Sequence, residues 1–204
     1  GGAPMPPQVR VRLARIWPHA RQTQIYGSTE SGPAGTVIGA ADMDRHPTGV
    51  GRAMQGYRVH LLAEEGKGSA SGDSGEILLE GPGVALGYWD NPEATAQTFR
   101  EIARGRRAVR MGDTGQIAAD GILLFEDRSA DRINRGGFKI SSIAVETALV
   151  AQPSVLEAAV VGVAHPALGE DVAAFVVLRP GANRDIDALK TALAEHLADN
   201  AIPR

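Results

Sequence analysis

Met111-Gly112-Asp113 is the first of two stretches that predict what kind of site this 204-residue chain carries. The second lies downstream and reads Asp127-Arg128-Ser129-Ala130-Asp131-Arg132-Ile133-Asn134-Arg135-Gly136-Gly137. The first stretch places a carboxylate, which can accept both hydroxyls of a diol, beside a glycine that permits a turn. The second stretch supplies an arginine, whose planar cation suits phosphate, and a double glycine that lets a ligand approach the backbone closely. An acceptor, a cation and an accessible backbone together indicate a nucleotide site.

An upstream block, Tyr26-Gly27-Ser28-Thr29-Glu30, has side chains of complementary chemistry. It follows a predicted strand at residues 21–25, so we expect it on a strand-ending loop. An aromatic face there can stack on a base, a threonine hydroxyl can donate to a phosphate oxygen, and a carboxylate can hold the Mg²⁺ that accompanies a triphosphate. Taken alone, the block is equally consistent with a plain turn around a buried tyrosine.

Each downstream motif also has a purely structural interpretation. Residues 112–115 alone would be a type I or type II turn between strands. The double glycine alone would be a β-bulge or a hairpin turn with an exposed Arg135. An arginine-rich stretch is either a solvated loop or a surface that attracts a ligand phosphate; its members are Arg104, Arg106, Arg107 and Arg110.

The composition limits the classes of function. Apolar residues make up 43% of the chain, which is ordinary for a globular protein with a real core. The net charge of −3 and the pI near 6.0 give no global positive field, so we expect no nucleic-acid partner. The chain has no cysteine, which excludes disulfides and a cysteine nucleophile and fits a cytoplasmic location. The most apolar run, residues 155–164, is far too short to span a membrane, and we expect no export signal.

The pattern of apolar residues changes near residue 127. Before it, short apolar runs separated by Gly- and Asp-rich turns predict mostly β structure, with one helix near residues 9–17 and another from Pro92 through Phe99 after an Asn91 N-cap. After it, the pattern predicts an α+β unit: a strand at 133–140 bent at its glycines, a helix at 142–151, strands at 156–163 and 172–178, and a helix at 186–197. We therefore expect an α+β fold with a domain boundary at Asp127 to Asp131.

The order and spacing of these motifs resemble the adenylate-forming superfamily, which contains acyl- and aryl-CoA synthetases, adenylation domains of nonribosomal peptide synthetases, and luciferases. Further blocks are similar to family blocks at residues 75–82, 84–89 and 165–170. We expect these blocks to be mostly structural and to include packing of Tyr88 and Trp89. The resemblance implies that residues 1–127 are the C-terminal part of a large AMP-binding domain, a β-rich remnant of a distorted barrel. It implies that residues 128–204 are a truncated small C-terminal α+β domain, with a hinge near residues 127–131.

The resemblance also implies which residues contact the nucleotide. Thr29 and Glu30 are the implied catalytic residues, since the family uses them for the α-phosphate and for the metal. Asp113 would accept both ribose hydroxyls, and Met111 stands where the family usually has a threonine. The other implied contacts are adenine stacking by Tyr26, the adjoining Gly27, and a ribose and phosphate contact by Arg128.

Further segments complete the implied site. Gly2-Ala3-Pro4 resembles the family segment whose backbone approaches the adenine and the acyl pocket. Arg135, Gly136 and Gly137 resemble the loop that lines the pantetheine tunnel after the small domain rotates, where absent side chains let a thiol reach the adenylate. Ala130 occupies the hinge position, where the family commonly has Asp or Lys. A hinge needs soft backbone torsions more than a particular side chain.

The activity implied by the resemblance is that of an AMP-forming acyl- or aryl-CoA ligase, which uses ATP, Mg²⁺, coenzyme A and a small-molecule carboxylate. Two alternatives stay open: an adenylation domain that loads a phosphopantetheinyl carrier protein, and a non-catalytic remnant that binds nucleotide or a partner surface. The family's phosphate loop would precede Gly1 and its final catalytic lysine would follow Arg204. We therefore expect this chain by itself not to adenylate a carboxylate.

Overall fold

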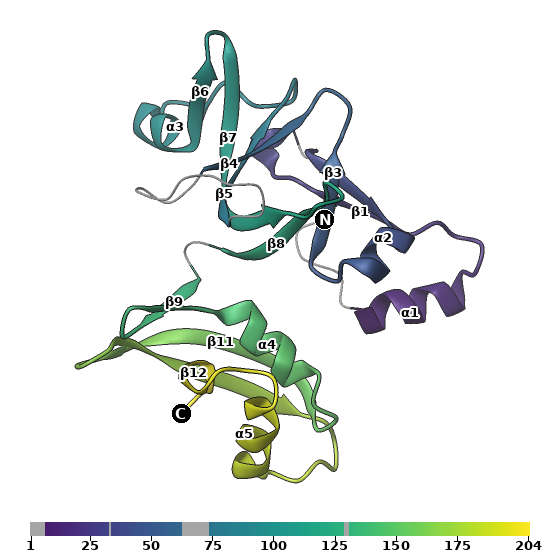
Figure 1. Ribbon diagram of the computed structural model, residues 1–204, viewed down its shortest axis with the longest axis vertical. Helices are drawn as coiled ribbons and strands as arrows, with labels where there is room; N and C mark the ends of the chain where they lie inside the picture. Colours follow the sequence, from purple (N-terminus) through teal and green to yellow (C-terminus); the bar gives the residue numbers. More distant parts are fainter. Residues whose placement is uncertain (1–6, 33, 63–73, 129–130) are drawn as a thin grey trace. The chain divides into compact units, whose positions relative to one another are not determined.

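The computed structural model describes residues 7–32, 34–62, 74–128 and 131–204 (Figure 1). The chain divides into two compact units, residues 1–126 and residues 127–204. Each unit has its own antiparallel sheet and its own hydrophobic core. The α+β fold class predicted from the sequence is confirmed. No helix within the described residues combines the length and apolar character needed to cross a membrane.

The first unit is built on an eight-stranded sheet. The strand order is β1-β2-β3-β8-β7-β5-β4, and β6 pairs with β7 beside this path. Paired strands run antiparallel, which short connections between consecutive strands allow. The strands are β1 (Thr23–Tyr26), β2 (Thr36–Gly39), β3 (Gly49–Ala53), β4 (Arg58–Leu62), β5 (Gly75–Glu80), β6 (Phe99–Ala103), β7 (Arg106–Ile117) and β8 (Leu123–Arg128).

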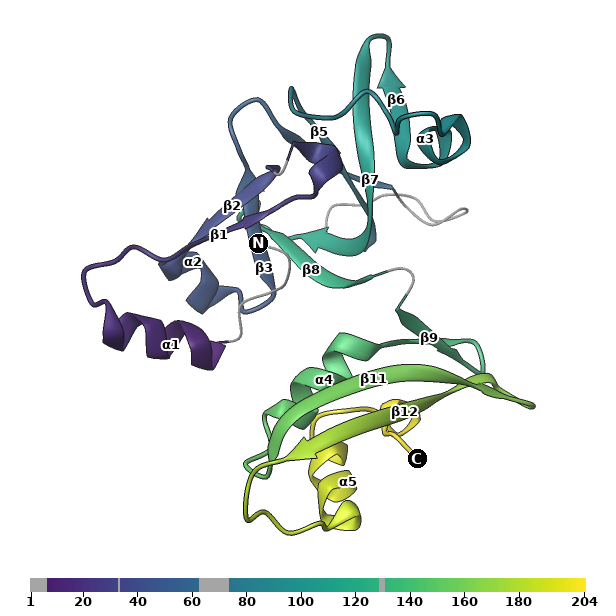
Figure 2. The ribbon, with the colours of Figure 1, turned by 180° about the vertical axis from the view of Figure 1, so that it is seen from behind.

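A bulge interrupts β7 where the sequence alone suggests a type I or type II turn. The residues on either side of Ile77 in β5 pair with Arg110 and Thr114, so Ile77 alone faces residues 111–113. Gly112 in this bulge has a φ of +68°, which is strained for any residue that carries a Cβ. A bulge bends the strand that contains it and redirects its side chains, and β7 bends sharply in Figures 1 and 2. The turn interpretation is therefore wrong, because the acidic residue after the glycine lies within a continuous strand.

The core of the first unit fixes the pair of strands that carries this bulge. Ile77 and Leu79 on β5 and Val109 on β7 are almost completely buried. A fully buried side chain of this size contributes about 1.5–3 kcal/mol relative to an exposed one. The other buried members of the same cluster are Val50, Phe99 and Leu123.

The helices of the first unit are short. α3 (Pro92–Thr98) begins as predicted, because Asn91 accepts a hydrogen bond from the Ala94 N–H and Pro92 takes the first helical position. α1 (Pro7–Ile16) confirms the other predicted helix. Of the apolar residues that recur at helical spacing here, Leu13 is partly buried, whereas Val9, Ile16 and Trp17 are exposed, Trp17 at 58%. The sequence pattern did not predict α2 (Ala40–Arg45).

The second unit contains a four-stranded antiparallel sheet in the order β10-β9-β12-β11. The single bent strand predicted at residues 133–140 is wrong: the structure has two strands, β9 (Arg132–Arg135) and β10 (Phe138–Ser141), paired as a hairpin. Gly136 and Gly137 form its turn, with φ values of +59° and +88°. The remaining predicted elements are present as α4 (Ser142–Val150), β11 (Val155–His165), β12 (Gly169–Leu178) and α5 (Ile186–Ala194).

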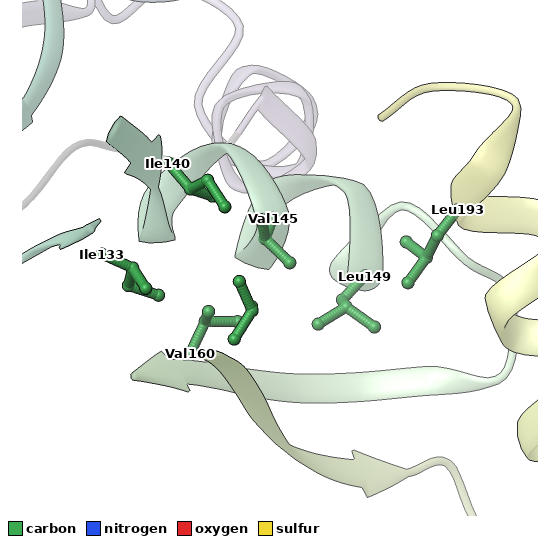
Figure 3. Packing of buried hydrophobic residues seen from close by; sticks show 7 residues of the cluster. Ile133, Ile140, Val145, Leu149, Val160 and Leu193 are labelled. Carbon is green, nitrogen blue, oxygen red and sulfur yellow. The ribbon is translucent and has the colours of Figure 1, made fainter. Parts of the chain in front are cut away.

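The core of the second unit joins α4 and α5 to the sheet. Figure 3 shows Val145 and Leu149 on α4 pointing toward Val160 on β11, with Leu193 of α5 beside Leu149. Ile133 on β9 is also buried in this cluster. Because Ile133 is anchored in the core, the hairpin that carries the double glycine is tied to the body of the unit.

Candidate functional site

The side chains of Tyr26 and Asp113 meet although 87 residues separate them in the sequence. The Tyr26 hydroxyl donates a hydrogen bond to Oδ2 of Asp113 at 2.6 Å. β1 ends at Tyr26, and the bulge of β7 carries Asp113, which is only 6% exposed. The Tyr26 ring also lies 6.5 Å from the Phe125 ring, tilted by 59°. The aromatic ring and the carboxylate that the resemblance assigned to one nucleotide therefore lie together.

The loop after β1 closes into a tight turn, the 3-10 segment η1 (Thr29–Ser31). The Ser31 hydroxyl accepts a hydrogen bond from the Ser28 N–H at 2.9 Å and donates to the backbone oxygen of Ala34 at 2.6 Å. The Ser28 hydroxyl lies 4.0 Å from the sulfur of Met111 in the bulge. Gly27 and Thr29 share this loop, so the upstream motif and the bulge form one continuous region of the first unit.

Glu30 is held by an aromatic residue from another loop. The Tyr88 hydroxyl donates a hydrogen bond to Oε1 of Glu30 at 2.7 Å. This hydrogen bond is the main reason that the pKa of the Glu30 carboxyl is lowered, and the Glu30 backbone and the Ser28 hydroxyl contribute less. The same contact raises the pKa of the Tyr88 hydroxyl. Glu30 is therefore a partly exposed anion at neutral pH, which suits a cation partner.

The available donors suit a Mg²⁺ ion that is shared with a nucleotide. Within the described part of the chain, no group of three or more His, Cys, Asp or Glu side chains is arranged to hold a metal. Mg²⁺ commonly binds one or two carboxylates and completes its shell with water and substrate phosphates. A single partly exposed carboxylate, Glu30, next to the exposed Thr29 fits that arrangement.

The other described candidates are Arg128, at the end of β8, and the residues of the glycine hairpin. Arg128 is the last residue of β8, and its side chain is exposed. The backbone N–H of Arg128 donates a hydrogen bond to Oδ1 of Asp127 at 2.8 Å. Asp127 is fully buried, and burial raises the pKa of its carboxyl. Gly136 and Gly137 are exposed at the hairpin turn. The other candidates lie outside the described residues: Gly2, Ala3, Pro4 and the hinge position Ala130.

Arg135 is buried, whereas the hairpin interpretation expected it to be exposed. Its Nε lies 2.6 Å from Oδ1 of Asp171, and its Nη1 donates to the backbone oxygen of Asn200 at 2.7 Å. The side chain is 6% exposed. The guanidinium therefore ties β9 to β12 and to the segment after α5. No spacing in the sequence signals Asp171 as the partner.

Much of the arginine-rich stretch makes internal ion pairs. Arg106 forms a bidentate pair with Glu80, with both N···O distances at 2.7 Å. Arg110 pairs in the same way with Glu76, at 2.9 and 2.6 Å. These bidentate ion pairs join β7 to β5. The structure therefore favours a structural role for these two arginines over a phosphate-binding one.

The sequence did not predict the contact between Tyr88 and Glu30, which are 58 residues apart. Tyr88 and Trp89 were both expected to pack as part of a structural block. Trp89 is instead 98% exposed. Tyr88 packs edge-on against Phe99, with ring centroids 5.7 Å apart, and directs its hydroxyl to Glu30. A tyrosine in a Gly-rich loop is the only sequence signal for this contact, and it names no partner.

Comparisons with known proteins match both parts of the chain. A family model described as AMP-binding enzyme matches residues 1–89, and one described as AMP-binding enzyme C-terminal domain matches residues 144–204. A medium/long-chain-fatty-acid–CoA/3-oxocholest-4-en-26-oate–CoA ligase from Mycobacterium marinum is 35% identical over 201 residues, which are 97% of this chain and 36% of that relative. The chain belongs to the adenylate-forming superfamily. It spans well under half the length of this superfamily relative.

Solved structures resemble the chain as well. The ATP-bound MatB from Rhodopseudomonas palustris has a TM-score of 0.86 and 33% identity, and the match covers 100% of this chain and 39% of that one. o-Succinylbenzoate CoA synthetase (MenE) from Bacillus subtilis, in complex with the acyl-adenylate intermediate OSB-AMP, has a TM-score of 0.85 and 26% identity over 100% of this chain and 40% of its own. The relative from Mycobacterium marinum is named as a CoA ligase of fatty acids and of 3-oxocholest-4-en-26-oate, and MenE is named as a CoA synthetase of o-succinylbenzoate.

Proposed function

We propose that this chain is part of an AMP-forming ligase that joins an acyl or aryl carboxylate to coenzyme A. The observation that carries the proposal is the 2.6 Å hydrogen bond between Tyr26 and Asp113. It joins two motifs that are ambiguous when they are considered separately. Together they supply a base-stacking ring and a diol acceptor at one place. The similarity to named CoA ligases supports the choice of reaction.

The proposed roles in the first unit follow from the chemistry of each group. Tyr26 stacks on adenine, and Asp113 accepts the ribose hydroxyls. Thr29 donates to an α-phosphate oxygen, and Glu30 ligates Mg²⁺. Mg²⁺, when bound, neutralises charge on the phosphates. Because the Tyr26 hydroxyl holds Asp113 and the Tyr88 hydroxyl holds Glu30, both carboxylates are oriented before the nucleotide arrives.

The proposed reaction has two steps. A carboxylate oxygen of the acid attacks the α-phosphorus of ATP, and pyrophosphate leaves, which gives an acyl-adenylate. The thiol sulfur of CoA then attacks the acyl carbon, the thiol proton is released, and AMP leaves with the electrons of the acyl–oxygen bond, which gives the thioester. Both steps transfer an activated group without any oxidation or reduction.

The second unit would serve the thioester step. We propose that residues 1–127 belong to the large domain, that residues 128–204 belong to the small domain, and that the link near Ala130 is the hinge. The Gly136–Gly137 turn is exposed and carries no side chains that would obstruct a thiol. The buried ion pair of Arg135 with Asp171 favours a role for Arg135 in holding this turn. Arg128 remains the proposed ribose and phosphate contact, and Gly2-Ala3-Pro4 remains the proposed adenine and acyl-pocket segment.

The two half-reactions of the full-length protein test the proposal. Carboxylate-dependent exchange of labelled pyrophosphate into ATP reports adenylation, and CoA-dependent thioester release reports the second step. We expect both activities with an acyl or aryl acid, and a loss of exchange of at least about tenfold in Asp113→Ala. Nucleotide binding without exchange across a panel of acids would favour a non-catalytic protein. Exchange that is followed by transfer to a phosphopantetheinyl carrier protein, and not to CoA, would favour a carrier-loading domain.

A further inference from the structure

The loop at residues 81–88 contacts both the backbone and the side chain of Glu30. The Ala85 N–H donates a hydrogen bond to the backbone oxygen of Glu30 at 2.9 Å. The Tyr88 hydroxyl donates to Oε1 of the same residue at 2.7 Å. The loop therefore fixes where Glu30 lies and also how its carboxylate is turned.

Tyr88 is itself held in place, so its hydroxyl is a fixed donor. Its ring packs edge-on against Phe99, which belongs to the core of the first unit. Its backbone N–H donates to Oγ1 of Thr95 on α3 at 2.9 Å. Thr95 in turn donates from its hydroxyl to the backbone oxygen of Asn91, the N-cap residue of α3. A tyrosine whose ring packs on Phe99 and whose backbone N–H is bound by Thr95 has little freedom to follow a moving carboxylate.

A partly exposed glutamate without a partner samples several rotamers, and ordering them on ligand binding costs free energy. The hydrogen bond from a fixed tyrosine removes part of that cost in advance. We propose that Tyr88 is a positioning residue, which orients the Glu30 carboxylate for the Mg²⁺ ion that accompanies ATP. This inference rests on the proposed function, in which Glu30 is the metal ligand. It assigns Tyr88 no contact with the nucleotide.

Calorimetry on the full-length protein tests this role without measuring turnover. A non-hydrolysable ATP analogue is titrated at a series of Mg²⁺ concentrations, and AMP is titrated without metal. Tyr88→Phe keeps the ring on Phe99 and removes only the hydroxyl. We expect the Mg²⁺ concentration for half-maximal analogue binding to rise by about 3- to 10-fold, which corresponds to one hydrogen bond, while AMP affinity changes by less than about twofold.

Tyr57→Phe is the matched control. The Tyr57 hydroxyl donates to the backbone oxygen of Ser31 at 2.8 Å, so it contacts the same turn but not the Glu30 carboxylate. We expect this variant to keep the wild-type Mg²⁺ requirement. Glu30→Gln should raise the requirement more than Tyr88→Phe does, and adding Tyr88→Phe to Glu30→Gln should have little further effect, because the hydroxyl acts through the carboxylate.

The outcomes separate this inference from the function on which it rests. If Glu30→Gln raises the Mg²⁺ requirement and Tyr88→Phe does not, the positioning role is wrong and the metal role of Glu30 stands. If neither variant changes the requirement, the metal role of Glu30 is wrong and the positioning role fails with it. If Tyr88→Phe and Tyr57→Phe weaken analogue and AMP binding equally, Tyr88 supports only the fold of the turn, and the inference is overturned.

Discussion

Oδ2 of Asp113 accepts a 2.6 Å hydrogen bond from the hydroxyl of Tyr26, across 87 residues of sequence. The carboxylate is 6% exposed and lies on a strand bulge, so its direction is set by the backbone and by the tyrosine together. A buried carboxylate in a fixed orientation needs little rearrangement to accept a diol. This relationship connects the bulge of β7, the end of β1 and the proposed adenosine site.

Because the bulge carries Asp113, a substitution in it should affect AMP affinity as well as stability, whereas a similar substitution elsewhere should affect stability alone. Gly112→Ala should lower the stability of the protein by about 1–2 kcal/mol, because the φ of +68° is strained for alanine, and a displaced Asp113 should also weaken AMP binding. Gly121→Ala is the matched control. Gly121 has a φ of +82°, a Cβ there would meet nothing within 4 Å, and it lies between β7 and β8, outside the bulge. Thermal unfolding and AMP calorimetry measure the two effects. Equal AMP affinity in both variants would show that the bulge does not position Asp113 for the nucleotide.

Arg135 should behave as a structural residue of the second unit. Arg135→Met removes the ion pair with Asp171 and the hydrogen bond to the backbone oxygen of Asn200, so we expect a lower free energy of unfolding. Adding Asp171→Asn to that variant should recover part of the loss, because the unpaired charge is removed. Denaturant unfolding checks both variants. If Arg135→Met instead kept its stability and bound CoA more weakly, Arg135 would be a ligand-binding residue.

The ion pair of Glu80 with Arg106 predicts a specific acid sensitivity. Hydrogen bonds from Arg106 and His60 lower the pKa of Glu80 from 4.5 to about 2. A depressed carboxyl pKa contributes stability that is present above pH 4.5 and is lost as the pH falls toward 2. The melting temperature of Glu80→Gln should therefore lie below that of the wild type at pH 7, and the difference should shrink as the pH falls from 5 to 3. A difference that stays constant over this range would contradict the pair's role.

The glycine hairpin predicts different effects on the two half-reactions. Gly137→Leu should slow CoA-dependent thioester release by more than about tenfold and leave pyrophosphate exchange nearly unchanged, if this turn guides the thiol. Gly181→Leu is the control for backbone strain, because its φ of +81° is close to the +88° of Gly137 and both sites are open to solvent. Equal losses in both half-reactions would argue against a thiol path at this turn.

Local signals were enough to predict several elements of the fold. The α3 helix follows from Asn91 and Pro92, whose capping roles depend on adjacent residues only. The hairpin of β9 and β10 was predicted as one bent strand. A pair of glycines permits either geometry, and the choice is made by pairing across the turn.

The site shows the same division between local and tertiary information. The motif containing Tyr26 and the one containing Asp113 are visible in the sequence, but the bulge that directs Asp113 depends on the register between β7 and β5. The burial of Arg135 depends on Asp171, which no local pattern connects to it. The hydrogen bond from Tyr88 to Glu30 likewise arises only after the loop packs on Phe99.

A double-mutant cycle of Tyr26→Phe and Asp113→Ala, with calorimetry of AMP binding to the full-length protein, tests whether these two residues form one adenosine site. Asp113→Ala should weaken AMP binding by about 1.5–3 kcal/mol, because the ribose hydroxyls lose a charged acceptor. Tyr26→Phe keeps the ring and should weaken binding by about 1 kcal/mol, and the double variant should match Asp113→Ala alone, because the hydroxyl acts through the carboxylate. Unchanged AMP affinity in Asp113→Ala, or strictly additive losses in the double variant, would contradict the assignment of these two residues to one adenosine site.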